Sequence, residues 1–298
     1  MQKYLYAFLL LLISNNVHAA LNIFACEPEW AALARELAAD KADIYSATTA
    51  LQDPHHIQAR PSLIAKARRA NLVVCTGAEL EAGWLPVILR ESGNTDIAPG
   101  KPGNFEAAHA VTMLEIPARL DRAEGDVHAA GNPHIQTDAR NFLPIARALS
   151  ARLSELDPAN AAFYRSRLQT FTQQWQAAIA RWEKQAAPLK GQPIAVQHRG
   201  FPYLNNWLEL RQVAELEPKP GMEPSAAHLS RVLEQLQRQP AKMVIRAAYQ
   251  SERPSAWLSE HARIPAVALP FSVGGTDGAK DLFGLFDDTI QRLLVALK

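Results

Sequence analysis

Several features that would narrow the class of this protein are scarce or absent in its 298 residues. The formal net charge is only +1, so the chain lacks the basic surface that binding to nucleic acid requires. No low-complexity segment or short-period repeat occurs. A His-Glu-x-x-His motif, the helical zinc site of many hydrolases, is also absent. The composition is otherwise that of a globular protein, 48% hydrophobic and 20% charged, with enough chain for two modest domains, each with its own core.

Cysteine is also scarce. The only two, Cys26 and Cys75, each close a short β-like run. A disulfide between them is compatible with an oxidising compartment, and two buried thiols fit the sequence equally well. The sequence leaves both open, because a disulfide needs Cα atoms within about 7 Å of each other.

The N-terminus predicts export. A lysine at position 3 precedes the apolar run Tyr4 to Ile13, and Val17-His18-Ala19 ends a polar stretch. This is the pattern of a secretory signal cleaved after about Ala19. The apolar run is too short to cross a bilayer, which takes about 20 residues. No cysteine stands at the cleavage site, so we expect a soluble periplasmic protein without a lipid anchor, acting as a monomer.

The first part of the mature chain alternates strand and helix patterns. The expected elements are strands at Asn22 to Ala25, Asp43 to Thr48 and Leu72 to Cys75, and helices at Glu29 to Ala39 and Ser62 to Ala70. This β-α-β-α-β order predicts a parallel sheet with helices on its faces. Such folds bind ligands beyond the carboxyl ends of their strands.

A long helix is predicted next. Asp157 suits an N-cap and Pro158 the first helical position, and no glycine or proline follows until Pro188. We interpret residues 158–187 as a rigid helix that joins an N-terminal lobe, residues 20–157, to a C-terminal lobe, residues 188–298. The C-terminal lobe repeats the alternation, with strands at Pro193 to Gln197, Met243 to Arg246 and Ala266 to Leu269, and helices at Leu204 to Leu210, Ser225 to Gln237 and Leu282 to Leu297.

Four residues are candidate metal ligands. His55 and His134 each follow a proline, which stiffens the loop, and His198 follows a strand. Asp281 follows a glycine-rich loop. Taken alone, Asp281 fits better as a helix N-cap or first-turn residue, and Asp277 competes with it as a ligand. Zinc takes about four ligands in a tetrahedron, so these four would fill its sphere. Asp53 is a candidate acceptor for an imidazole N–H behind the metal.

Longer motifs carry a resemblance to a known family. They are DPHHIQARPS from Asp53, NLVVCTGAELE from Asn71, GNPHIQTDARN from Gly131, LDPANAAFY at the long helix, AVQHRGFPYL around His198, AELEPKPGMEPSAAHL from Ala214, and SVGGTDGAKDLFGLFD from Ser272. In this order they resemble the metal-specific (cluster A-I) solute-binding proteins of ABC transporters, especially the zinc-uptake branch.

The resemblance implies a fold and a function. The fold is α/β, two lobes each with a parallel sheet flanked by helices, joined by one long rigid helix. The resemblance also implies that one Zn(II) per chain is held between the lobes by His55, His134, His198 and Asp281. His56 would not bind the ion. The partners would be a membrane permease with its ATPase, and a periplasmic metal-donor protein is a further candidate. No enzymatic activity is expected.

The metal preference is read at the third ligand. Manganese-binding members carry a carboxylate there, whereas His198 is an imidazole, which suits zinc. One departure concerns the His-rich loop that many zinc members carry, since residues 118–131 hold a single histidine, His128. His109, His228 and His261 have no assigned role.

Three alternatives stay open. A secreted zinc hydrolase would keep one coordination position free for water, which the chain offers if Asp281 points away. A manganese-binding member or a surface adhesin with the same fold is also compatible with the sequence.

Overall fold

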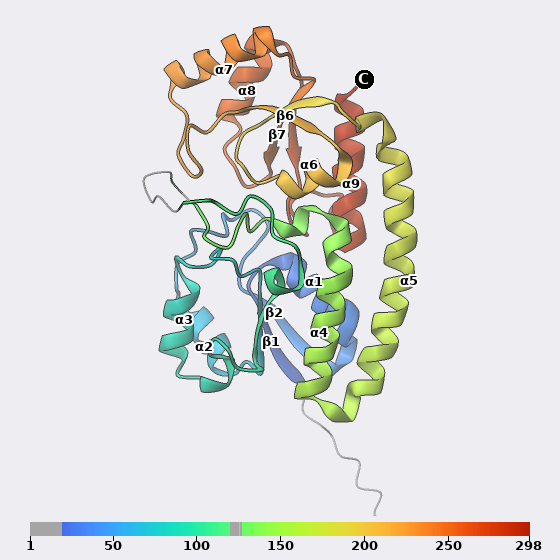
Figure 1. The fold of residues 1–298 in the computed structure, drawn as a ribbon. Helices are drawn as coiled ribbons and strands as arrows, with labels where there is room; N and C mark the ends of the chain where they lie inside the picture. The colour runs from blue at the N-terminus through green and yellow to red at the C-terminus, as the bar shows by residue number, and fades with distance from the viewer. Residues whose placement is uncertain (1–19, 120–124, 126) are drawn as a thin grey trace, which may run out of the picture.

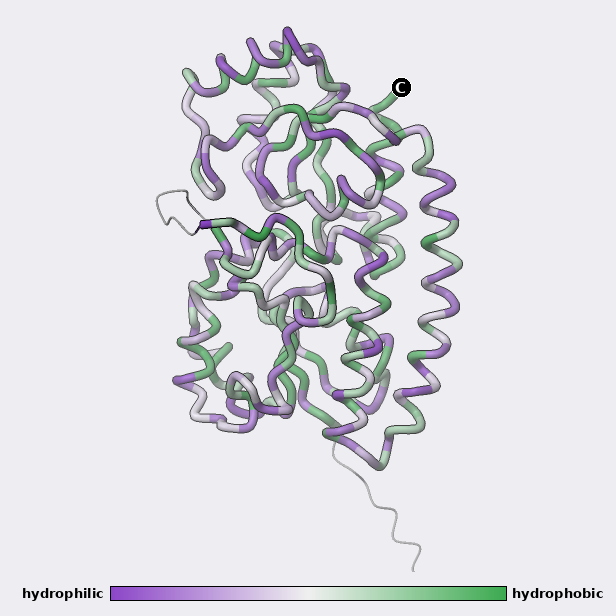
Figure 2. Tube along the Cα trace, in the orientation of Figure 1, coloured by the Kyte–Doolittle hydropathy of each residue, from purple (hydrophilic) through white to green (hydrophobic). Residues whose placement is uncertain are grey.

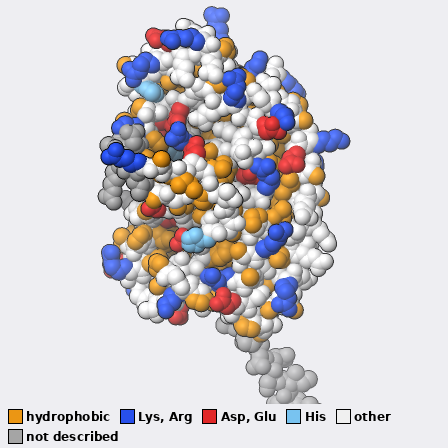
Figure 3. Space-filling view, viewed as in Figure 1, with side chains coloured by type: hydrophobic (Ala, Val, Ile, Leu, Met, Phe, Trp, Pro, Cys, Tyr) orange, Lys and Arg blue, Asp and Glu red, His pale blue; other side chains and the backbone are white. Residues whose placement is uncertain are grey.

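The computed structural model describes residues 20–119, 125 and 127–298. The predicted signal segment, residues 1–19, lies outside the described residues. Two α/β lobes lie one above the other, and a single long helix runs beside both (Figure 1). None of the described helices has the length and apolar composition to cross a membrane. Cationic and anionic side chains are interspersed over the face seen in Figure 3, in keeping with the small net charge.

The N-terminal lobe contains a four-stranded parallel sheet of order β2-β1-β3-β4. Its strands are β1 Leu21–Ala25, β2 Ala42–Ser46, β3 Leu72–Cys75 and β4 Asn104–Glu106. Its helices are α1 Pro28–Ala38, α2 Pro61–Arg68, α3 Leu85–Ser92 and α4 Phe142–Leu156. Strand β3 is buried along its whole length, as expected of a strand covered on both faces.

The C-terminal lobe repeats this topology with the strand order β6-β5-β7-β8, again all parallel. Its strands are β5 Pro193–Val196, β6 Arg211–Glu215, β7 Met243–Ala247 and β8 Ala266–Leu269. Its helices are α6 Pro202–Leu208, α7 Ala226–Arg238, α8 Arg253–Ala262 and α9 Leu282–Ala296. The two predicted sheets and the class of fold are confirmed.

The long helix is α5, Ala161–Ala186. In Figure 2 its apolar residues alternate with polar ones along its length, because one side packs inward and the other meets solvent. Its buried residues are Tyr164, Phe171, Trp175, Ala178, Trp182 and Ala186. The linking helix predicted over residues 158–187 is therefore present, with short 3-10 turns at its two ends.

Aromatic rings from α5 join the two lobes into one core. Trp175 lies 5.3 Å from Phe142 of α4 and 5.6 Å from Phe286 of α9, measured between ring centroids. Trp182 lies 5.2 Å from Phe286. The largest cluster of buried apolar residues consequently extends across both lobes, with smaller clusters on their outer sides. The expected pair of separate cores is not what the structure shows, and the lobe boundaries at residues 157 and 187 stay a prediction.

Cys26 and Cys75 form a disulfide, which decides between the two alternatives that the sequence left open. Cys26 follows β1 and Cys75 ends β3, two neighbouring parallel strands, and their Cα atoms are 4.8 Å apart. The bond therefore ties together the carboxyl ends of two central strands, directly below the loops that leave this edge of the sheet.

We predict that reducing this disulfide lowers the free energy of unfolding. The bond closes a loop of 49 residues, for which chain-entropy arguments give about 4 kcal/mol. Urea unfolding with and without a reductant measures the difference. The Cys26→Ser/Cys75→Ser double variant is the control, because a reductant should leave its transition unchanged. An unchanged transition in the reduced natural protein would contradict the prediction.

Candidate metal site

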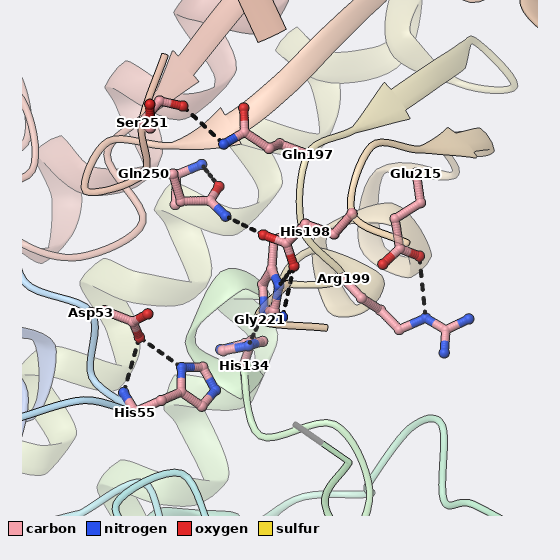
Figure 4. Close-up of polar contacts among 12 residues, drawn as sticks. Asp53, His55, His134, Gln197, His198, Arg199, Glu215, Gly221, Gln250 and Ser251 are labelled. Atoms are coloured by element: carbon pink, nitrogen blue, oxygen red, sulfur yellow. Dashed lines mark hydrogen bonds and ion pairs between the residues drawn. The ribbon is translucent and has the colours of Figure 1, made fainter. Parts of the chain in front are cut away.

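Three histidines from distant parts of the sequence meet between the lobes. His55 lies in the loop after β2, His134 caps a 3-10 turn, Ile135–Thr137, and His198 follows β5. The first two belong to the N-terminal lobe and the third to the C-terminal lobe. Figure 4 shows the three side chains gathered in one place. All three are buried, with 7%, 2% and 6% of their surface exposed.

The spacing of the three rings matches that of ligands around one ion. Their ring nitrogens lie within 4.8 Å of one another, and Nε2 of His134 is 3.4 Å from Nε2 of His198. Two nitrogens bound to the same tetrahedral zinc, at 2.0–2.1 Å each, lie about 3.4 Å apart. Nε2 of His55 and Nδ1 of His134 are buried without a hydrogen-bond partner. Buried polar atoms are normally paired, so the unpaired Nε2 of His55 fits a nitrogen that binds an ion, whereas the unpaired Nδ1 of His134 is not the nitrogen that faces His198.

A carboxylate lies behind two of the imidazoles. Asp53 Oδ1 is 2.8 Å from Nδ1 of His55 and also accepts the backbone N–H of His55, which confirms the predicted contact. Glu217 Oε2 is 2.7 Å from Nδ1 of His198 and accepts the N–H of Gly221. Such contacts fix the tautomer, so that Nε2 is left to bind the metal. Glu217 was not predicted from the sequence, because its contact with His198 arises only when the loop after β6 folds back onto β5.

The pKa values of the groups follow from this arrangement. Burial, with the neighbouring His55 and His198, holds the pKa of His134 well below its usual value. Burial also opposes the protonation of His198, but the hydrogen bond with Glu217 and the negative charges of Glu217, Asp53 and Glu215 together outweigh it and raise the pKa of His198. His134 is therefore neutral at pH 7 and offers a free lone pair, as a metal ligand must.

The structure does not bring Asp281 to the three histidines. It is the exposed N-cap residue of α9, and its Oδ1 accepts the backbone N–H of Gly284 at 2.7 Å. Among the described residues, no carboxylate joins the group of three imidazoles. The predicted fourth ligand thus has the alternative role that the sequence left open, because a capping aspartate and a ligating one have the same local pattern. Asp277, the competing candidate, is exposed as well.

Two further histidines lie at the edge of the site. The ring of His56 is 6.1 Å from that of His55 and that of His128 is 5.5 Å from it, between centroids. His56 is exposed and His128 is half-buried. Both therefore lie beside His55, outside the group of three.

Hydrogen bonds from both lobes surround the site. The side-chain amide of Asn132 donates to the carbonyl of Arg199 at 2.8 Å. The hydroxyl of Tyr203 donates to the carbonyl of Asn132 and accepts the N–H of Leu114. The lobes are consequently held together on one side of the histidines by polar contacts that are independent of any ion.

A second polar contact between the lobes involves a buried acid. The hydroxyl of Ser272, after β8, donates to Glu29 at the start of α1. Burial raises the pKa of Glu29 to about 7, and the bond from Ser272 partly offsets the rise. Burial likewise raises the pKa of the neighbouring Glu81 to about 7 and that of Glu27 well above its usual value. At least part of this acidic cluster is therefore protonated at neutral pH.

Comparison with known proteins identifies the family. Residues 23–296 match the family model described as ZnuA, zinc-uptake complex component A, periplasmic. The chain belongs to this family. It is a family of metal-binding, substrate-binding components of ABC transporters, not of enzymes, and such components work with a membrane permease and an ATPase.

Individual relatives are distant. The chain is 21% identical to the metal ABC transporter substrate-binding lipoprotein ScbA of Streptococcus cristatus, and 21% identical to the manganese ABC transporter substrate-binding lipoprotein PsaA of Streptococcus mitis, in each case over 85% of this chain and 80% of the relative. A crystal structure of ZnuA superimposes with a TM-score of 0.78 at 20% identity, covering 94% of this chain and 100% of the other. A manganese-bound periplasmic metal-binding protein of Candidatus Liberibacter asiaticus gives 0.75 at 15% identity over 93% and 99%. These structures share the fold.

We predict that Glu217→Ala lowers the affinity for zinc by roughly 10- to 100-fold, because it removes the acceptor that orients His198. Glu217→Gln keeps an acceptor but loses the charge, so we expect an intermediate loss. Competition against a chromophoric chelator measures both. Glu223→Gln, an exposed site in the same loop, is the control, and an equal effect there would contradict the prediction.

We also predict that Glu29→Gln stabilises the protein more at pH 8 than at pH 5. The pKa of Glu29 is about 7 in the folded protein against an ordinary 4.5, so the unfolded chain binds fewer protons between these values. Stability contributed by Glu29 is therefore lost as the pH rises from about 4.5 through 7, and glutamine does not ionise.

Thermal melts of both proteins from pH 5 to pH 8 measure this difference. The melting temperature of the variant relative to the natural protein should rise with pH. The exposed Glu91→Gln is the control and should show no such trend. A difference that is constant with pH would contradict the prediction.

Proposed function

We propose that this chain is a periplasmic zinc-binding protein, which captures Zn(II) between its lobes and delivers it to an ABC permease for uptake. The protein ligands are His55, His134 and His198, and one ion is carried per chain. The observation that carries the proposal is the donor set, three buried imidazoles at the spacing of zinc ligands.

The all-nitrogen donor set supports zinc over manganese. Imidazole suits zinc, whereas manganese favours carboxylate and water oxygens. The two nearest carboxylates, Asp53 and Glu217, bind the Nδ1 atoms of His55 and His198 and not the space between the rings. Several curated relatives carry manganese in their names, so the metal is the point that needs an experiment.

The same geometry supports a simple path for the cargo. The N-terminal lobe presents His55 and His134, and the C-terminal lobe closes over the ion with His198. Release to a permease then needs only a small adjustment of the lobes or of the loops that withdraws His198, because the aromatic core around α5 holds the lobes together. We further propose that residues 1–19 are a cleaved signal, that the mature protein is a periplasmic monomer, and that a metal-donor protein in the periplasm is a second partner.

We expect the metal-stripped mature protein to bind one zinc per chain and manganese far more weakly. Bound zinc should raise the melting temperature, since a ligand at 100 times its Kd adds about 2.7 kcal/mol. His198→Ala should weaken zinc binding by roughly 100-fold or more, a larger loss than that expected from Glu217→Ala, which removes only the acceptor behind His198. Chelator competition and thermal melts give both quantities.

His109→Ala is the matched control, because His109 is exposed and lies away from the site. His198→Asp should shift the preference toward manganese. Tighter binding of manganese than zinc by the natural protein would overturn the zinc assignment. Zinc binding that survives His198→Ala would overturn the site.

A further inference from the structure

Three histidines leave one position of a tetrahedral zinc without a protein ligand. Asp281 lies elsewhere, and the four described carboxylates named next have other partners. Asp53 and Glu217 bind the backs of the imidazoles, and Glu115 and Glu215 both lie within 4 Å of the guanidinium of Arg199. Within the part of the chain that the structure describes, the fourth ligand is therefore sought in another residue type.

His128, six residues before His134, is a side chain beside the site that can supply a further nitrogen. Its ring centroid is 5.5 Å from that of His55. The three clustered rings are 5.3, 5.4 and 6.0 Å apart, and two imidazoles on one tetrahedral zinc have centres about 5 Å apart. His128 thus lies beside His55 at a separation close to that within the group of three.

The backbone around His128 is held in place. The N–H of Ala129 donates to the carboxylate of Glu79 at 2.7 Å, and the N–H of Gly131 donates to the carbonyl of His128 itself at 3.2 Å. The N–H of Asn132 donates to the carbonyl of Leu114. This turn connects directly to His134, so the two histidines are presented by one anchored segment.

We propose that His128 is the fourth protein ligand, which completes a four-imidazole site with His55, His134 and His198. The inference rests on the proposed function, since it concerns the same ion. The ring nitrogens of His128 lie outside the group whose members are within 4.8 Å of one another, so binding includes a rotation of this side chain toward the ion. Its anchored backbone limits the movement to the side chain.

The proposal has a chemical consequence. A fourth neutral nitrogen makes the site entirely imidazole and excludes the water that a three-histidine site would hold. Such a site favours metals with high affinity for nitrogen over manganese. It also takes three of its four ligands from the N-terminal lobe, and only His198 from the C-terminal lobe.

Cobalt(II) is the probe for the test, because its visible spectrum reports the ligands and geometry around the ion. The natural protein should give the intense bands of a tetrahedral site, and X-ray absorption of the zinc form should count four imidazoles. His128→Ala should lower zinc affinity by roughly 10- to 100-fold, change the cobalt spectrum, and reduce the count to three. Added free imidazole should restore the spectrum of the variant.

His56→Ala is the matched control, because His56 is also adjacent to His55 but exposed. An unchanged cobalt spectrum and zinc affinity in His128→Ala would overturn the proposal, as would three imidazoles in the natural protein or an equal effect of His56→Ala. In each of these cases the proposed function would stand. A different result would contradict the proposed function itself: zinc binding that His198→Ala does not weaken.

Discussion

The aromatic packing around α5 is the constraint on which the rest of the structure depends. Trp175 and Trp182 of this helix contact Phe286 of the C-terminal lobe, and Trp175 also contacts Phe142 of the N-terminal lobe. Both indoles are fully buried and hydrogen-bonded, Trp175 to the carbonyl of Ala139 and Trp182 to Asp287. Because these contacts fix the two lobes relative to one another, they also fix the distance between His198 and the histidines of the other lobe.

The sequence predicted the parts whose signals are local. Strands β3 and β8 appear with the expected bounds, and the uninterrupted pattern of α5 predicted the helix that joins the lobes. The short strands β4 and β6 were not predicted, because each has polar residues at most of its few positions. The single core was not predicted either, since periodicity reports which face of an element is buried but not which partner covers it.

The site divides in the same way. The Pro-His loops of His55 and His134 and the strand-end His198 could be recognised from sequence and resemblance, and the structure brings them together. The role of Asp281 could not be decided from the sequence, because a carboxylate before a helix accepts the free N–H groups there as readily as it binds a metal. Glu217 had no local signal, since its role depends on a contact with His198, 19 residues earlier.

The disulfide also removes a pair of side chains that could compete with the histidines for a metal ion. Cys26, Cys75 and Glu81 have their ligand atoms within 4.8 Å of one another. As thiolates, the two cysteines would form a competing site for zinc and copper. Oxidation removes the chain's entire supply of thiols. A chain whose disulfide forms before a metal ion binds has no thiolate site at Cys26 and Cys75. In the disulfide form, the three histidines do not compete with thiolates of this chain for the ion.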